Sequence, residues 1–180
     1  DITSDGKSRN NAIFARPFND KNAIPEQLTG NNFYIKSYFH GYGGKSYQCI
    51  EVNDQIYLVW IDQISKALWL RVLKVQEVVP GNNNGYFLFD KKARQLTESI
   101  ESNFDNSFIV SKNFLYGLCE IKNKDYLFSL NLKKNKQKIR KIKKFDNFVG
   151  NLSSNTSANL FSWIEWDSNF MPWEKNYLFF

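Results

Sequence analysis

Residues 47–61 read YQCIEVNDQIYLVWI, and this stretch decides the fold class. Apolar and polar side chains alternate on both sides of Asn53 and Asp54, which is the spacing of a half-buried β-strand. Both residue types suit a tight hairpin turn because they tolerate left-handed backbone angles. The stretch therefore predicts two antiparallel strands, Tyr47–Val52 and Gln55–Ile61, joined by a short turn.

The same alternation recurs along the chain between clusters of Gly, Asn and Asp, which indicates further strands and turns. Aromatic residues make up 17% of the 180 residues, and this richness favours strands because flat rings pack well on a pleated surface. No helix of ordinary length is predicted, so we expect an all-β fold. The other expected strands are Ala12–Arg16, Ala67–Leu73, Tyr86–Phe89, Phe108–Val110, Phe114–Glu120, Tyr126–Leu132, Ile139–Lys143, Leu160–Trp166 and Asn176–Phe180.

Strands followed by a turn and a short polar strand recur at intervals of roughly 40 to 70 residues, and propeller blades repeat at about 40–50 residues. This spacing favours a β-propeller, although periodicity alone does not exclude a β-sandwich. The chain has room for about three blades of an incomplete ring, starting inside the first blade and stopping inside the third. Boundaries are expected near residues 30–40, 98–106 and 144–150. The short polar segments are Glu26–Thr29, Arg94–Thr97 and Gln137–Ile142.

Two regions leave the local structure open. Residues 75–93 interrupt a blade, and their Pro-Gly-Asn run is expected to be a loop of undecided role. Tyr86–Phe89 is either an extra strand or a blade edge. Pro25–Gln27 and Lys91–Ser99 are the segments with a short helical or turn-like alternative.

The net charge of +6 invites a nucleic-acid hypothesis, and much of the excess lies in Lys133–Lys144. The first part of this run is predicted to be a hairpin tip and the second part an outer edge strand. Lysines on such an edge hinder unwanted strand pairing. Since no strand couples the run to a base-stacking surface, we expect a solvated edge and no nucleic-acid partner.

Cys49 and Cys119 lie within apolar strand patterns, far apart in sequence, so they are expected to be reduced core thiols. Their spacing does not suggest a metal site, and no cofactor is expected. The chain shows no signal peptide and no apolar run long enough for a membrane span, so a cytoplasmic location and no membrane partner are expected. It begins with Asp1, so its natural N-terminus is expected to lie upstream.

Three stretches together resemble the N-terminal propeller of prolyl-oligopeptidase-family serine peptidases of the acylaminoacyl and dipeptidyl peptidase type. The first is His40-Gly41-Tyr42-Gly43-Gly44, the second is the strand around Leu68-Trp69 leading to Arg94–Thr97, and the third is Phe161–Leu178. The third stretch contains Trp166-Asp167 followed by Met171-Pro172-Trp173-Glu174, and it is the most specific. The family carries a His-Glu-Tyr-Gly-Gly motif and a Trp-Asp…Met-Pro-Trp-Asp motif at similar places. The resemblance covers almost the whole chain.

The resemblance implies a two-domain hydrolase in which a propeller restricts peptide access to an α/β-hydrolase domain holding the catalytic serine, aspartate and histidine. This chain contains no Gly-x-Ser-x-Gly nucleophile elbow, so we expect residues 1–180 to be a partial propeller without catalytic residues. Its expected partners are the missing C-terminal α/β-hydrolase domain and peptide substrates. Whether the chain is a natural product or a fragment, and whether the enzyme is an exo- or endopeptidase, stays open.

The same motifs supply the candidate residues for substrate gating or the domain interface. The glycines permit backbone angles that a side chain would block, and the tryptophans offer flat apolar area between blades. Gly41 and Glu174 stand where the family usually has Glu and Asp, and Ser168–Phe170 also departs from the family pattern. The candidates are His40, Gly41, Tyr42, Gly43, Gly44, Trp166, Asp167, Met171, Pro172, Trp173 and Glu174.

Parts of the sequence also resemble three other kinds of functional site or module. The loop at His40 resembles an esterase oxyanion loop, but a nucleophile elbow and a second histidine are missing. Glu165, Asp167 and Glu174 lie among tryptophans, as in sugar sites, yet Asp167 and Glu174 are more simply explained as caps of the turn around Pro172. The remaining alternative is a stand-alone or degenerate propeller that binds a protein or peptide partner.

Overall fold

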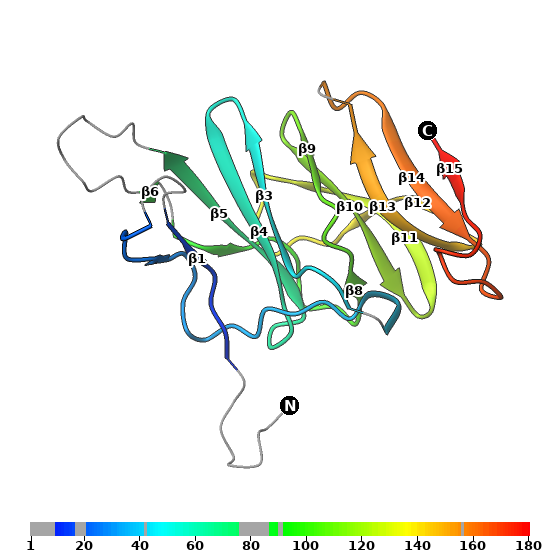
Figure 1. Ribbon diagram of the computed structural model, residues 1–180, viewed down its shortest axis with the longest axis horizontal. Helices are drawn as coiled ribbons and strands as arrows, with labels where there is room; N and C mark the ends of the chain where they lie inside the picture. Colours follow the sequence, from blue (N-terminus) through cyan, green and yellow to red (C-terminus); the bar gives the residue numbers. More distant parts are fainter. Residues whose placement is uncertain (1–9, 17–20, 42, 76–86, 90–91, 156) are drawn as a thin grey trace, which may run out of the picture.

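The computed structural model describes residues 10–16, 21–41, 43–75, 87–89, 92–155 and 157–180. These residues form four antiparallel sheets that follow one another along the chain, each of which stays open (Figure 1). The expectation of an all-β fold is confirmed. The only helical segment in the described ranges is a 3-10 turn, η1 (Phe39–Gly41). None of the described segments is a helix long and apolar enough to span a bilayer.

The sheets use strands that are neighbours in sequence. The first sheet pairs β1 (Phe14–Ala15) with β2 (Glu26–Gln27). The second contains β3 (Tyr47–Val52), β4 (Gln55–Asp62), β5 (Ala67–Val75), β6 (Phe87–Phe89) and β7 (Arg94–Gln95). The third contains β8 (Asn103–Phe104), β9 (Ile109–Ser111), β10 (Phe114–Ile121), β11 (Lys124–Asn131) and β12 (Arg140–Lys144). The fourth contains β13 (Phe148–Ser154), β14 (Phe161–Trp166) and β15 (Tyr177–Phe179).

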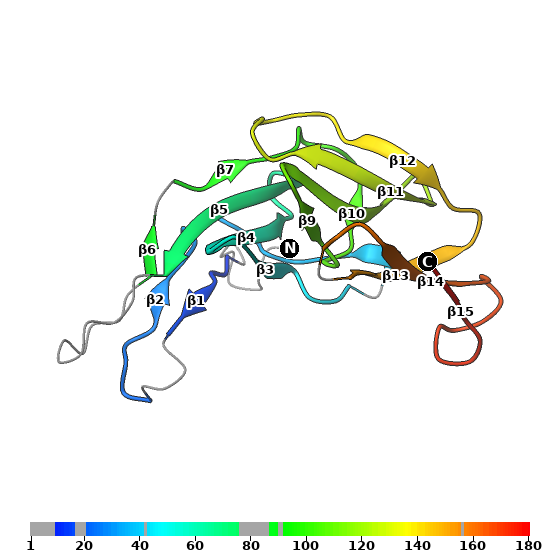
Figure 2. The ribbon, with the colours of Figure 1, turned by 90° about the horizontal axis from the view of Figure 1, so that it is seen from above.

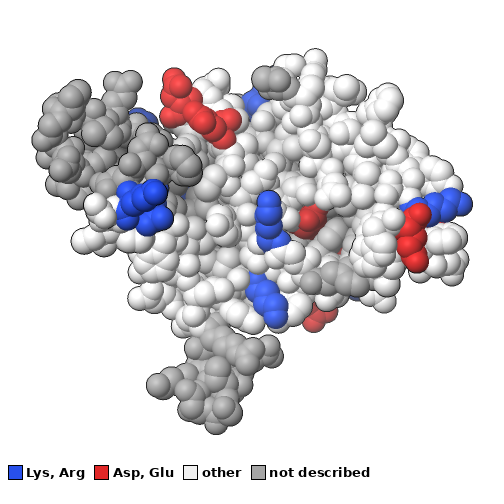
Figure 3. Space-filling view, viewed as in Figure 1, with Lys and Arg blue, Asp and Glu red and all other residues white. Residues whose placement is uncertain are grey.

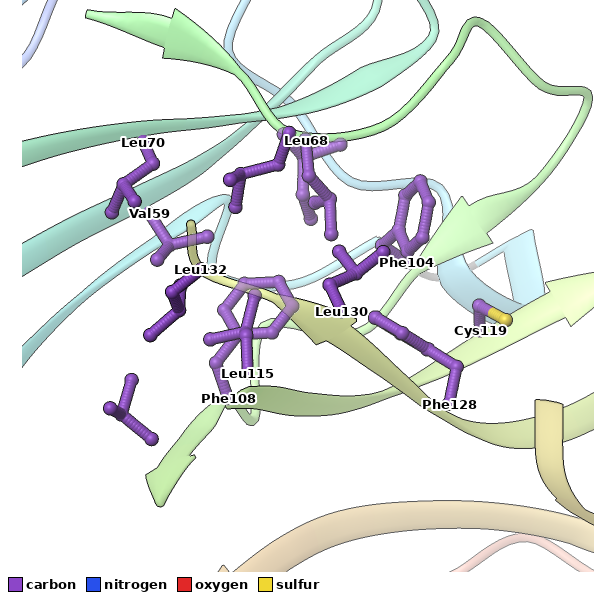
Figure 4. Packing of buried hydrophobic residues seen from close by; sticks show 13 residues of the cluster. Val59, Leu68, Leu70, Phe104, Phe108, Leu115, Cys119, Phe128, Leu130 and Leu132 are labelled. Carbon is purple, nitrogen blue, oxygen red and sulfur yellow. The ribbon is translucent and has the colours of Figure 1, made fainter. Parts of the chain in front are cut away.

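The sheets stack on one another through three apolar clusters, and strand alternation explains how one strand serves two of them. Along β4, Leu58 and Trp60 face the first sheet, whereas Val59 and Ile61 face the third sheet. All four side chains are almost completely buried. Figure 4 shows the cluster between the second and third sheets, where Leu68 lies near the ring of Phe104 and Leu70 lies beside Val59. The third cluster joins β10 and β11 to β13 of the fourth sheet.

The Gln-Leu-Thr triplets at residues 27–29 and 95–97 have the same local structure. In each copy the glutamine side chain donates to the threonine carbonyl and the leucine is buried. The leucine N–H donates to, and the threonine hydroxyl accepts from, the backbone of one earlier residue. Each copy thereby gives acceptors to two backbone N–H groups, that of the leucine and that of the earlier residue. The hydrogen bonds are Leu28 N to Ile13 O (2.7 Å), Ile13 N to Thr29 Oγ1 (2.9 Å), Leu96 N to Leu68 O (2.8 Å) and Leu68 N to Thr97 Oγ1 (3.0 Å).

Adjacent sheets are also joined along their outer strands. Thr97 and Gln137 form a parallel bridge, and Gln137 N donates to Leu96 O at 3.0 Å. The guanidinium of Arg94 donates to the carbonyl oxygens of Lys134 and Leu132. In Figure 2, β7 and β12 run along one side of the row of sheets, and β3 and β13 lie along the opposite side.

Several expectations need correction. Phe148–Ser154 is a strand that the sequence did not predict, because Gly150, Asn151 and the serines break its apolar alternation. A register shift between Gly150 and Ser153 accommodates this irregularity. The helical alternatives for Pro25–Gln27 and Lys91–Ser99 are wrong where the chain is described, since both segments supply short strands. Cys49 is exposed, whereas Cys119 is the buried free thiol that was expected.

Most of the interrupting segment, and Tyr42, lie outside the described residues. Within that segment Phe87–Phe89 is a strand that pairs with the end of β5. The hairpin turn at Asn53 and Asp54 is confirmed, with positive φ angles of 50° and 59°. The outer edge strand is also confirmed, since every residue of β12 is exposed.

Candidate functional site

The imidazole of His40 lies at the junction of three segments. His40 is held in the 3-10 turn η1 with a positive φ of 50°. Its ring packs against Phe39 at 3.8 Å, Phe148 at 4.7 Å and Trp166 at 5.5 Å between ring centroids. The side chain is 4% exposed. His40 therefore has the surroundings of a buried packing residue, shared between the loop before β3 and the fourth sheet.

The polar partner of His40 is Asp125, at the start of β11. Nε2 of His40 lies 2.7 Å from Oδ2 of Asp125, and the aspartate side chain is 3% exposed. The same oxygen accepts a hydrogen bond from the backbone N–H of Val149 at 3.0 Å. The carbonyl of Asp125 accepts from Phe145 N at 3.0 Å. A single buried aspartate thus joins the loop, the third sheet and the fourth sheet, and its buried oxygen is fully used.

A second and a third carboxylate lie close to this junction. Glu120 Oε2 accepts from the backbone N–H of His40 and from Nδ2 of Asn103, each at 3.3 Å. Burial raises the pKa of Asp105 above its usual range, and hydrogen bonds from Ser107 and Asn106 partly oppose this change. The carboxylates orient backbone and side-chain donors, as expected in a structural polar network.

The glycines of the motif have backbone angles that explain their presence. Gly41, Gly43 and Gly44 have φ angles of 75°, 77° and 143°. At Gly43 a Cβ would lie 2.9 Å from the carbonyl oxygen of Ser37, so a side chain would collide with backbone. Gly41 and Gly43 therefore permit the tight backbone path beside His40, whose ring contacts Asp125.

The second motif begins beside His40 and continues through an exposed turn. Trp166 is buried against His40 and Phe148, whereas Trp173 is 76% exposed. Pro172 lies in the connection between β14 and β15, as expected. The structure thus brings His40 and Trp166 together and leaves the Met171–Glu174 turn exposed.

The carboxylates of the second motif have local partners. Asp167 Oδ1 accepts from Asn169 N, and Glu174 Oε2 accepts from Met171 N, both at 2.8 Å. These are the turn-capping bonds that the sequence predicted. Glu165 Oε1 accepts from the indole N–H of Trp163 at 2.8 Å. Because each acid binds a neighbour in sequence, the geometry gives no support to a pair of acids facing each other across a sugar.

A hollow of about 280 Å³ opens beside the junction. Its wall combines the β10–β11 turn, the connection into β13 and the start of the second motif, and it is largely polar. In the described part of the chain, no group of three His, Cys, Asp or Glu side chains could hold a metal ion. The hollow is lined by Asn123, Lys124, Asp125, Phe145, Asp146, Asn147, Phe148, Asp167 and Ser168.

Sequence reasoning missed Asp125 and Glu120. The turn between β10 and β11 consists of Lys122 and Asn123, with positive φ angles of 51° and 58°, so Asp125 lies inside the strand. Asp125 shares a strand face with Leu127, which is buried in the third cluster. A charged residue at an inward position of a strand was the available signal.

Comparisons with known proteins bear on the fold. The chain matches no protein-family model and no curated protein. A solved peptidase shares its fold. That structure is a puromycin-hydrolysing peptidase of Mycobacterium tuberculosis, similar to this chain with a TM-score of 0.63 and 14% identity. The match covers 86% of this chain and 24% of the peptidase, so the chain spans about a quarter of that protein.

Proposed function

We propose that this chain is a non-catalytic, propeller-like segment of a serine peptidase that limits peptide access to an α/β-hydrolase active site outside these residues. The observation that carries the proposal is the likeness of 86% of the chain to part of a peptidase chain. The motif resemblance to the prolyl-oligopeptidase family agrees with that likeness. Because folds host many functions, the proposal needs an activity test.

The arrangement of the sheets supports the propeller part of the proposal. Antiparallel sheets of neighbouring strands stack in sequence order with apolar clusters between them, as blades do. The repeated Gln-Leu-Thr structure relates the first sheet to the end of the second. We propose that the chain supplies about three blades of an incomplete ring, with boundaries near residues 30–40, 98–106 and 144–150.

The junction at His40 supports a gating or interface role for the motif residues. His40 packs against Trp166, which precedes the exposed turn around Trp173, and its partner Asp125 lines the polar hollow. Exposed aromatic side chains next to polar groups are common where one domain meets another. The candidates for this contact are Asp167, Met171, Pro172, Trp173 and Glu174.

The first test is a peptidase assay with aminoacyl and acyl-aminoacyl chromogenic substrates. It compares this chain with the complete product of the reading frame that contains it. We expect hydrolysis only by the longer product, abolished by a serine-directed inhibitor. Activity in neither protein would contradict the peptidase assignment and favour a binding module. Activity of this chain alone would contradict its non-catalytic role.

The screening role needs a second comparison in the longer product. Trp173→Ala in that product is expected to change hydrolysis of peptides of about ten residues more than hydrolysis of a single aminoacyl substrate, because only longer peptides contact the segment. Ile64→Ala, at another exposed apolar residue, is the matched control. Equal effects on both substrates would contradict access screening.

A further inference from the structure

The positive charge of the chain is concentrated in one short segment. Residues 133–144 contain eight Lys or Arg and no Asp or Glu, whereas the whole chain has 24 basic and 18 acidic residues. The remaining residues therefore have 16 basic against 18 acidic side chains, a net charge of −2. The overall charge of +6 thus arises entirely from the basic segment, which we define as residues 133–144.

The basic segment ends in a strand with an open edge. β12 pairs with β11, from Ser129↔Arg140 to Tyr126↔Lys144, and it is the last strand of its sheet. All five of its residues are exposed. Figure 2 shows β12 along the rim of the row of sheets, away from β3 and β13. The outer edge of β12 therefore presents backbone N–H and C=O groups that no strand of the described chain pairs with.

Two of the lysines on this strand are held in place by aromatic rings. Nζ of Lys141 lies 4.0 Å from the centroid of the Tyr126 ring. Nζ of Lys143 lies 5.0 Å from the Trp163 ring and 5.2 Å from the Phe145 ring. Such cation–π contacts restrict the side chains without neutralising their charge. Their restricted positions reduce the entropy that binding an anion would cost.

The basic segment has no acidic partner within the described ranges, where the one ion pair present joins His40 to Asp125. The face shown in Figure 3 lies on the side of the molecule away from β12, and it carries only scattered charged side chains. Like charges placed opposite each other destabilise strand pairs, so two copies of β12 repel one another. Acidic side chains in the same positions would be attracted.

We propose that β12 is the docking strand for an extended, acidic peptide segment of a partner protein, which adds to the open edge of the third sheet. The backbone edge supplies hydrogen bonds and the lysines supply selectivity for carboxylates, which is the logic of strand addition. A peptide fits this edge better than a nucleic acid, because the rings beside β12 are covered by lysine ammonium groups and are not free to stack on bases.

The test uses the full chain and a fluorescent peptide of about eight residues that alternates glutamate with valine, a length typical of strands. Binding is followed by fluorescence anisotropy at low and moderate salt. We expect binding that weakens with salt, and at least about a tenfold loss of affinity in Lys141→Glu/Lys143→Glu. Lys21→Glu/Lys45→Glu changes the net charge equally at two exposed lysines elsewhere and should bind nearly normally.

A backbone-methylated peptide of the same sequence separates strand addition from simple charge attraction. It keeps its carboxylates but loses its hydrogen-bond donors, so we expect it to bind at least about tenfold more weakly. Hydrogen exchange should show new protection of the β12 amides in the complex, independently of any variant. Equal binding of the methylated peptide, or tighter binding of an oligonucleotide or of anionic vesicles, would overturn the proposal.

Discussion

Nε2 of His40 lies 2.7 Å from Oδ2 of Asp125, although the two residues are separated by 85 positions in the chain. The contact joins the turn before the second sheet to the hairpin of the third sheet, and Val149 extends it to the fourth sheet. Both side chains are buried, so neither can exchange its partner for water without exposing the junction.

Replacing Asp125 is expected to destabilise the fold. Asp125→Ala would leave the His40 ring nitrogen and the Val149 N–H buried without an acceptor, which costs about 2–4 kcal/mol in the free energy of unfolding. Asp125→Asn keeps an oxygen for Val149 and should cost less. Urea denaturation followed by circular dichroism measures both. Asp146→Asn, at an exposed neighbour, is the control and should have little effect on stability. Wild-type stability in Asp125→Ala would contradict a stabilising role for the hydrogen bonds of Asp125.

Asp105 is expected to make stability depend on pH. Burial raises its pKa above the ordinary range of an aspartate, and its Oδ2 is buried without a hydrogen-bond partner in the described residues. Between about pH 4 and the folded pKa, Asp105 therefore holds its proton more in the folded state than in the unfolded state. Its contribution to the free energy of unfolding falls as the pH rises across that range. Asp105→Asn should raise the free energy of unfolding at pH 7 by an amount on the order of 1 kcal/mol.

The same variant should change stability little below pH 4, where the aspartate is protonated in both states. Denaturation measured at several pH values gives the two profiles. If the stability of Asp105→Asn changes between pH 4 and 7 with the same slope as that of the wild type, Asp105 is not a source of the pH dependence.

Gly117 is expected to tolerate no side chain. A Cβ there would lie 2.9 Å from ring carbons of both Phe108 and Phe128, which are buried in the cluster between the second and third sheets. Gly117→Ala should cost about 1–3 kcal/mol through overpacking. Adding Phe108→Leu should remove part of that strain, so the double variant should lose less stability than the sum of the single variants. Additive losses in the thermal unfolding experiment would argue against a steric cause.

The exposed end of the fourth sheet is expected to make the isolated chain associate or precipitate. Trp173, Leu178 and Phe180 are 76%, 64% and 80% exposed, which is unusual for a group of large apolar side chains. Replacing all three with serine should shift the size-exclusion profile towards monomer, whereas Ile64→Ser should not. A wild-type chain that elutes as a clean monomer and melts sharply would contradict this expectation.

Local patterns predicted the long strands well, because each has one or both faces in an apolar cluster. The hairpins around Asn53 and the exposed edge at β12 follow directly from residue type and alternation. β13 escaped prediction since its two inward residues, Val149 and Leu152, are separated by an irregular register. Its strand conformation depends on tertiary packing, with Trp166 close to Gly150, and that contact is not visible in local sequence.

The candidate site was predictable in part. His40 and Trp166 were selected from separate motifs, and the structure places their rings 5.5 Å apart. The spacing of residues in the sequence could not identify Asp125 as the partner of His40. The two residues come together only because the loop before β3 packs against the third and fourth sheets. Cys49 was predicted to be buried and is exposed. It lies in β3, a strand at the end of its sheet that alternates between exposed and half-buried residues, so one face of the strand meets solvent.

The links between the second and third sheets bear on how the molecule opens. Arg94 and the Thr97–Gln137 bridge connect these sheets along one rim, and a shared apolar cluster fills the space between them. Amide hydrogens in both sheets should therefore exchange with solvent in one cooperative opening event, as expected of a single folding unit. The strands β1 and β2 are only two residues long, so we expect this short pair to open before the two longer sheets. The chain would then unravel from its amino-terminal side while its centre remained folded.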